Sequence, residues 1–120
     1  MFRIPAIRLA EPQHASPTHM YEYAWKSRAL DGALGAAYSV DIPFFFNTLG
    51  TSGAERLTGQ DAPQDLADSM HSTWVSFIHR EAPGWEAYTP DQPAVHRFDT
   101  STETVLDPRS EARLAWDGVR

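Results

Sequence analysis

The chain has 120 residues, of which 42% are hydrophobic and 22% charged, with a formal net charge of -6; this is the composition of one soluble globular domain. The negative charge disfavours binding to nucleic acid or to an anionic membrane, and no apolar run approaches the ~20 residues of a membrane-spanning helix. The sequence contains no cysteine, which excludes disulfides, thiolate metal sites and a cysteine nucleophile.

The first part of the chain predicts a helix, a loop and a strand. Apolar residues on one face predict a short helix over 5–11, with Pro5 in its first turn. Pro12 and Pro17 bracket a polar surface loop. The aromatic stretch 18–25 contains no helix breaker and predicts a strand. Because apolar side chains fall on both faces of that stretch, we expect an interior strand that is covered on both sides.

The stretch 35–47 is expected to be a loop that leads into a buried segment. Gly35 allows the backbone to turn tightly, and Pro43 argues against a regular helix. The three phenylalanines at 44–46 are interpreted as core residues rather than as a ligand pocket. The small, polar stretch 48–54 that follows is expected to be an exposed, flexible connector.

The second half predicts one long helix and a hairpin. Asp61 to Gln64 has the form of a capping box, so a helix should begin there and end near Arg80. Alternating runs at 95–99 and 103–106 predict a small hairpin, and 110–116 predicts a closing helical turn. The long helix carries an apolar stripe at spacings of three and four, formed by Leu66, Ala67, Met70, Trp74, Phe77 and Ile78.

The five histidines do not form a recognisable metal site. His14 and His19 are interpreted as solvent-exposed residues in or beside a loop, because no third ligand follows at a suitable spacing. His71 and His79 are eight residues apart on the predicted helix, too far to share an ion, and the residues after His79 do not match a zinc-binding HExxH. His96 is interpreted as a half-exposed hairpin residue. No metal or cofactor is therefore expected.

Ser52 and Asp41 are two further candidates for a catalytic role. Ser52 lies in a glycine-rich string that resembles G-x-S-x-G, but Gly53 falls one place early, so a nucleophile elbow is not predicted. Asp41, next to the phenylalanine run, is either a carboxylate with a perturbed pKa or an acid that caps a helix or anchors the loop.

The chain contains, in a specific order, the segments 2–6, 20–25, 35–44, 66–77, 98–99 and 107–108. Together these segments resemble the C-terminal part of the type-B carboxylesterases, the family of bacterial para-nitrobenzyl esterases and of cholinesterases. The resemblance implies the C-terminal portion of an α/β-hydrolase fold, with one core strand, two main helices, a small terminal hairpin and an incomplete central sheet. It also implies hydrolysis of carboxylic esters by a Ser-Glu-His triad.

The resemblance assigns the family's catalytic histidine to the position of Tyr38. The family's loop reads Gly-x-x-His-x-x-Glu-Ile-Pro-Phe, and here Gly35 to Phe44 matches it with Tyr38 at the histidine and Asp41 at the glutamate. A phenol ordinarily titrates near pH 10 and cannot shuttle a proton at neutral pH as imidazole does. The family's nucleophilic serine, acidic triad member and oxyanion-hole glycines have no counterpart in these residues.

We therefore expect a carboxylesterase segment, a pseudoenzyme that is inactive alone. The alternative is a non-enzymatic interaction module whose contact surface is the strand 21–25 or the helix 66–78, and a free-standing hydrolase with an unrelated site ranks last. Residues 1–120 are expected to be a single segment of an α/β-hydrolase domain, from a truncated gene or a fragment, and cytoplasmic if the chain is complete. A lone interior strand would have two unpaired edges, so the expected partner is an upstream hydrolase portion or a second copy.

Overall fold

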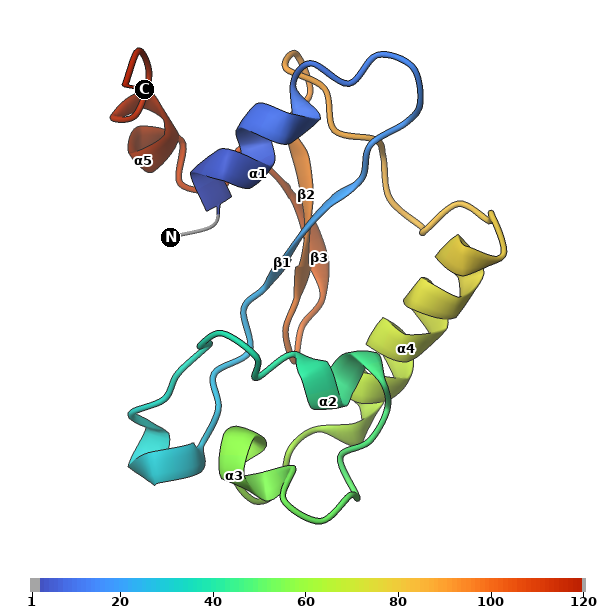
Figure 1. Cartoon of the computed structure of the whole chain (residues 1–120), viewed down its shortest axis with the longest axis vertical. Coiled ribbons are helices and arrows are strands. Elements are labelled where there is room, and N and C mark those ends of the chain that lie inside the picture. The colour runs from blue at the N-terminus through green and yellow to red at the C-terminus, as the bar shows by residue number, and fades with distance from the viewer. Residues whose placement is uncertain (1–2, 120) are drawn as a thin grey trace.

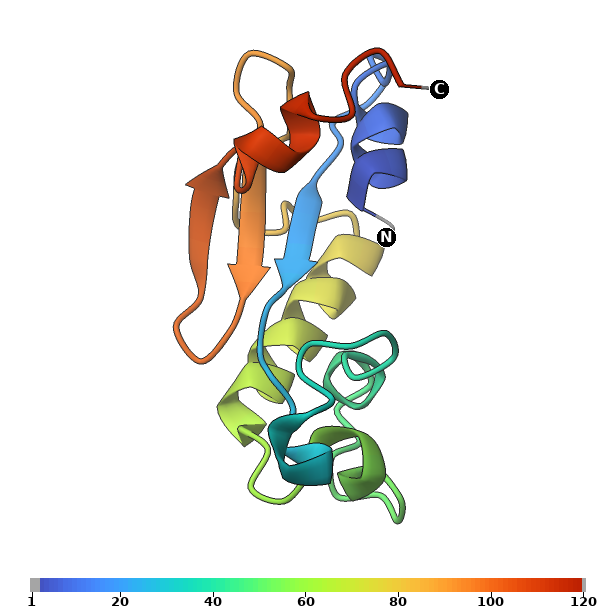
Figure 2. The same ribbon diagram turned by 90° about the vertical axis from the view of Figure 1, so that its left-hand side faces the viewer.

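The computed structural model describes residues 3–119. In it, three strands form one mixed sheet, and helices lie beside both faces of this sheet (Figures 1 and 2). The small α/β architecture expected from the sequence is confirmed. The elements in chain order are α1 (Arg3–Ala10), β1 (Met20–Tyr23), the short helical turn η1 (Ala29–Gly32), α2 (Ile42–Phe45), α3 (Glu55–Thr58), α4 (Gln64–Ile78), β2 (Ala94–Phe98), β3 (Glu103–Leu106) and α5 (Ser110–Leu114).

The sheet has the order β1-β2-β3. β2 and β3 are antiparallel, which confirms the predicted hairpin, and β1 pairs in parallel with β2, with Met20 opposite Val95 and Tyr23 opposite Phe98. The predicted interior position of the first strand is wrong for the described residues, because β1 lies at an edge of their sheet. The expectation of two unpaired edges is also wrong, since β2 pairs with one of them. Two-sided burial can be read from a local pattern, but the neighbour of a strand cannot.

Side chains pack on both faces of the sheet, as the pattern of the first strand predicted. On one face, α1 contributes Ile7 and Ala10 to a cluster with Tyr88 and Val95. On the other face, α2 and α4 meet β1 through aromatic side chains, since Phe45 and Trp74 each lie edge-on to Tyr21 with ring centres 5.7 Å apart. The larger cluster there, called the main cluster below, consists of Trp25, Val40, Phe44, Leu66, Ala67, Met70 and Phe98.

The helix α2 corrects the expectation that Pro43 prevents a helix. Pro43 is the second residue of this single turn, where its missing N–H requires no acceptor. The carbonyl of Asp41 accepts hydrogen bonds from the N–H groups of Phe44 and Phe45, both at 3.0 Å. Of the three phenylalanines, Phe44 is fully buried whereas Phe46 is 69% exposed, so the core interpretation is confirmed for only part of the run.

The segment between α2 and α4 is more structured than a flexible connector. Most of residues 48–54 are exposed, as predicted, but Leu49 packs against the main cluster. The unpredicted helix α3 follows and contacts η1. This contact is held by hydrogen bonds from the Ser27 hydroxyl to the Leu57 carbonyl at 2.6 Å and from the Arg28 N–H to the Thr58 carbonyl at 3.2 Å.

The predicted long helix is confirmed as α4, but its predicted capping box is wrong. Pro63 precedes the first turn, no side chain caps it, and Asp61 adopts a left-handed backbone with φ of 59°. Gln64 instead donates its side-chain N–H groups to the side-chain oxygens of Asn47, at 2.7 Å, and Asp68, at 2.8 Å. The amide therefore ties the helix start to the preceding loop.

The apolar stripe of α4 is buried only in its first half. Leu66, Ala67 and Met70 lie in the main cluster, whereas Phe77 and Ile78 are 49% and 72% exposed. None of the helices in residues 3–119 is long and apolar enough to cross a membrane.

Candidate functional site

The loop that contains Tyr38 is held at both ends. At its start, the N–H of Ser27 donates to the carbonyl of Gly35 at 3.0 Å, and Gly35 has a left-handed φ of 59°. At its end, Val40 is buried in the main cluster next to α2. The local sequence accounts for this geometry, because a glycine accepts the left-handed turn and an apolar anchor fixes the exit. The loop therefore presents residues 36–39 from a fixed base.

Tyr38 lies at the surface, with 84% of its area exposed. The neighbouring Ser39 has a positive φ of 72°, a conformation that is uncommon outside glycine. The turn continues through hydrogen bonds from the Val40 N–H to the Ala37 carbonyl and from the Ile42 N–H to the Ser39 carbonyl, both at 3.3 Å. A side chain at position 38 is thus accessible from solvent.

Asp41 is half-buried and directly precedes α2, but its carboxylate does not cap that helix. The side-chain capping interpretation is therefore wrong, and Asp41 supports α2 through its backbone carbonyl instead. The negative charge of its carboxylate affects the pKa of two tyrosines of β1, Tyr21 and Tyr23. Burial raises the pKa of Tyr21 and of Tyr23, and the negative charge of Asp41 raises both further.

Tyr23 is a polar group of this region that the sequence did not single out. Its hydroxyl oxygen is buried and has no hydrogen-bond partner among the described residues. Besides Asp41, the charge of Asp99 contributes to its raised pKa. A phenol in this setting stays neutral and can donate a hydrogen bond. In the sequence, the aromatic residues of this stretch indicated only a strand. The sequence could not show that Asp41 and Asp99 lie near Tyr23, because that proximity depends on the tertiary fold.

The histidines occupy different environments. His14 is exposed, as expected, but His19 is not a solvent-exposed bystander: it is half-buried, lies edge-on to Trp85 at 5.9 Å, and its Nδ1 is buried. His71 donates from Nδ1 to the carbonyl of Phe45 at 2.8 Å, since a carbonyl can only accept; this bond links α4 to α2.

His96 is half-buried, as predicted, and stacks on Trp85 with ring centres 4.3 Å apart. Burial lowers the pKa of His96. Within residues 3–119, no three His, Asp or Glu side chains gather in a way that could hold a metal ion.

No family model matches the sequence, but individual proteins do. The chain is 28% identical over 122 residues to the para-nitrobenzyl esterase of Bacillus subtilis (strain 168), an alignment that covers 94% of this chain and 24% of that protein. It is 27% identical over 110 residues to the phenmedipham hydrolase of Pseudarthrobacter oxydans, covering 79% of this chain and 21% of that protein.

Solved structures agree with these sequence relatives. A thermophilic para-nitrobenzyl esterase superposes with a TM-score of 0.81 at 25% identity, over 92% of this chain and 24% of that one. A carboxylesterase of Geobacillus stearothermophilus superposes with a TM-score of 0.75 at 27% identity, over the same shares. The chain thus spans about a quarter of the length of its relatives.

These neighbours have the α/β-hydrolase fold, so the resemblance inferred from the ordered segments and the fold class are both confirmed. Over almost its whole length, the chain is thus similar to about one quarter of a para-nitrobenzyl esterase, an enzyme of the type-B carboxylesterase family.

Proposed function

We propose that the chain is the part of a carboxylesterase that carries the catalytic-histidine loop, and that it does not hydrolyse esters alone. The observation that supports this most directly is similarity to para-nitrobenzyl esterases over almost the whole chain, combined with a tyrosine at position 38 of the matching loop motif. The exposed position of Tyr38 on an anchored loop is compatible with a former catalytic position. Asp41 is proposed as the supporting acid of that position.

The chemical reason is the difference between phenol and imidazole. The histidine of a serine hydrolase accepts the proton of the nucleophile and returns it to the leaving group, which requires a group that titrates near neutral pH. A tyrosine side chain ordinarily titrates about three units higher. In addition, the printed sequence contains no G-x-S-x-G nucleophile elbow.

The first experiment measures hydrolysis of a para-nitrophenyl ester by the purified chain. We expect no turnover above the uncatalysed rate. The Tyr38→Phe variant is the matched control, because it removes only the hydroxyl. Hydrolysis by the chain that disappears in Tyr38→Phe would contradict the proposal and assign a catalytic role to the phenol.

A second experiment tests the position itself. The corresponding quarter of the Bacillus subtilis para-nitrobenzyl esterase is replaced by this chain, and a second chimera also carries Tyr38→His. Because loss of a triad histidine costs roughly 10⁶-fold in kcat in a serine hydrolase, the first chimera should be inactive and the second should recover measurable activity. Thermal unfolding of both chimeras separates loss of fold from loss of chemistry. Two folded chimeras with equal activity would contradict the assignment of Tyr38.

We also propose that the segment works in contact with a hydrolase portion or with a second copy. The support is the exposed end of the α4 stripe, at Ile78, and β1, whose one edge has no partner strand within residues 3–119. The same observations support the alternative function, a non-enzymatic interaction module that binds through α4 or β1. Ester hydrolysis by the Tyr38→His chimera favours the esterase origin of the loop, whereas binding of the chain to a partner without any rescue of activity favours the module.

A further inference from the structure

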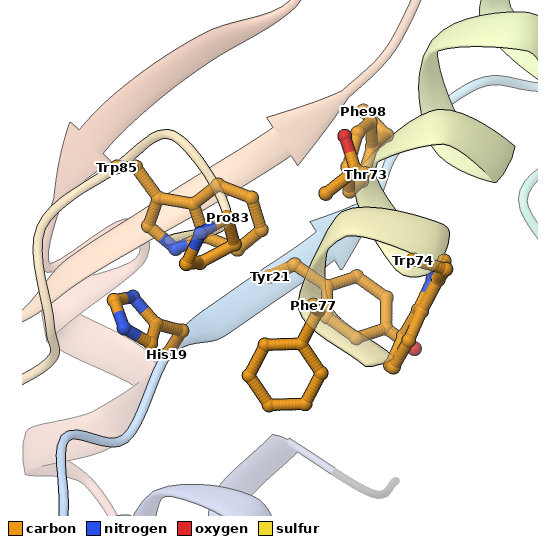
Figure 3. Close-up of a pocket in the computed structure, with 8 residues that line it drawn as sticks. All are labelled: His19, Tyr21, Thr73, Trp74, Phe77, Pro83, Trp85 and Phe98. Atoms are coloured by element: carbon orange, nitrogen blue, oxygen red, sulfur yellow. The ribbon is translucent and has the colours of Figure 1, made fainter. Parts of the chain in front are cut away.

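A pocket outside the Tyr38 loop lies between the second half of α4 and the start of β1 (Figure 3). Its volume is about 70 Å³. Thr73, Trp74 and Phe77 of α4 form one wall together with Tyr21 of β1. The positions 73, 74 and 77 share a helix face because they are three and four residues apart.

His19, Pro83 and Trp85 lie across the pocket from Tyr21 and Phe77 (Figure 3), and the buried Phe98 completes the lining. Trp85 is fixed in place by two contacts. Its indole N–H donates to the carbonyl of Met20 at 3.1 Å, and its ring stacks on His96 with an interplanar angle of 8°. This wall is therefore formed before any ligand arrives.

The rings around the pocket are arranged edge to face. Tyr21 and Trp74 meet at 90° with centres 5.7 Å apart, and Trp85 and Phe98 meet at 87° with centres 6.1 Å apart. Such a herringbone arrangement is the favourable packing of aromatic rings, and one more ring can continue it. Figure 3 shows the two walls separated, with Trp85 and His19 on one side and Tyr21 and Phe77 on the other.

The charge and size of the pocket restrict its ligand. Among the described residues, those lining the pocket include no Asp, Glu, Lys or Arg, and a chain with net charge -6 repels anions. A fully enclosed benzene needs a cavity of about 150 Å³. The pocket therefore accommodates only part of one ring, with the remainder at the mouth beside the half-exposed Phe77.

We propose that this pocket binds an uncharged, single-ring aromatic compound, which inserts one edge of its ring between Trp85 and Phe77 and leaves a polar substituent in solvent. The proposal does not depend on Tyr38, on Asp41 or on ester hydrolysis. Because the ring is only partly buried, we expect a dissociation constant on the order of millimolar.

The test is a titration of the 120-residue chain with benzyl alcohol, followed by the indole N–H resonances of its four tryptophans in an NMR spectrum. We expect saturable shifts for Trp74 and Trp85, which line the pocket, and none for Trp25 and Trp116, which do not. Cyclohexylmethanol has the same size without the ring, and benzoate carries a charge; both should bind more weakly. Equal shifts with cyclohexylmethanol, linear shifts, or shifts of all four indoles would overturn the proposal.

Three variants locate the ligand. Phe77→Ala removes one wall and should weaken binding about two- to tenfold, the range of one aromatic pair. Thr73→Leu should abolish binding by filling the pocket, and costs little to the fold because the Thr73 hydroxyl only donates back to the Ser69 carbonyl at 2.9 Å. Phe46→Ala, at the exposed residue that follows α2, is the matched control and should leave binding unchanged. Unchanged binding in a folded Thr73→Leu variant would overturn the assignment of this pocket.

Discussion

At the scale of single residues, the three consecutive phenylalanines differ in burial although their side chains are identical. Phe44 is buried and packs against Trp25 and Tyr23, with ring centres 5.1 Å and 5.5 Å away. Phe45 is half-buried against Trp74, and Phe46 is mostly exposed. In a helical turn, consecutive residues point about 100° apart, so only one of three neighbours can face the core directly.

This difference predicts unequal costs of truncation. Phe44→Ala should lower the free energy of unfolding by about 3–5 kcal/mol, the range for a buried phenylalanine. Phe46→Ala should change it by less than about 0.5 kcal/mol, as expected of a surface site. Urea unfolding of the two variants checks the prediction, and similar midpoints for both would contradict the burial of Phe44 and the exposure of Phe46.

A second residue-scale prediction concerns Gly59, which closes α3 with φ of 76°. A Cβ atom at this position would lie 2.7 Å from the backbone nitrogen of Ala29, and neither backbone can move without losing the contact between α3 and η1. Gly59→Ala should therefore cost about 2–5 kcal/mol, from the left-handed backbone together with the overlap.

Gly53→Ala is the matched control, because Gly53 also has a positive φ but no heavy atom within 4 Å of the added Cβ. It should cost only the backbone term of about 1–2 kcal/mol. The comparison is made by urea unfolding. If the two variants were equally stable, the close approach of α3 to η1 would be wrong.

At the scale of elements, α5 differs from the other helices because polar contacts hold it. None of its residues is buried. Arg113 forms a two-pronged ion pair with Asp107 at 2.9–3.3 Å, Arg109 pairs with Glu22 at 2.5 Å, and Arg8 of α1 donates to the carbonyl of Trp116 at 2.9 Å. Exposed ion pairs are weakened by salt, so α5 is the element whose attachment depends most on solution conditions.

We predict that α5 detaches at acidic pH before α4 unfolds. The hydrogen bond from Arg113 holds the pKa of Asp107 below its ordinary value. A carboxyl with a depressed pKa stabilises the folded state fully above its ordinary pKa near 3.9, and this contribution is lost as pH falls through the lower, folded value. Hydrogen–deuterium exchange at a series of pH values, corrected for intrinsic rates, should show protection of residues 110–114 falling below about pH 4.

The control is Asp107→Asn, which removes the titrating group. Its α5 should be less protected at neutral pH and should show a smaller change on acidification. An acid-induced loss of the same size in both proteins would assign the effect to other carboxylates.

At the scale of the whole molecule, the unburied surface is the main feature. The second half of α4 presents Ile78, which is largely exposed, and the described sheet ends at β1. Apolar helix faces and unpaired strand edges are both sites of association. The larger core cluster includes residues from the first half of α4, and the smaller one includes residues of α1. Neither cluster includes a residue from the second half of α4.

We therefore predict concentration-dependent association of the isolated chain. Ile78→Asp should shift sedimentation toward the monomer, because it places a charge in the contact without removing a core side chain. Glu81→Gln, an exposed residue just beyond α4, is the control and should leave association unchanged. A monomer that unfolds cooperatively at all concentrations would contradict the proposal that the segment needs a partner.

The sequence by itself was sufficient for the long amphipathic helix, the hairpin, the first helix and the order of segments that resembles the carboxylesterases. These features depend on residues close together in the chain, such as apolar positions three and four apart or alternating runs around a short turn. The presence of Tyr38 at the histidine position of the loop motif can likewise be recognised from neighbouring residues alone. The loss of catalysis that we expect from it stays a prediction.

The tertiary structure alone decided which of these features meet. The parallel pairing of β1 with β2 joins Met20 to Val95, and the aromatic pocket joins His19, Phe77 and Trp85; these contacts are distant in sequence and leave no periodic signal. The helical turn that contains Pro43 and the exposure of the end of the α4 stripe also depend on tertiary packing. Burial is a property of what packs against a segment, and a local pattern records only the segment itself.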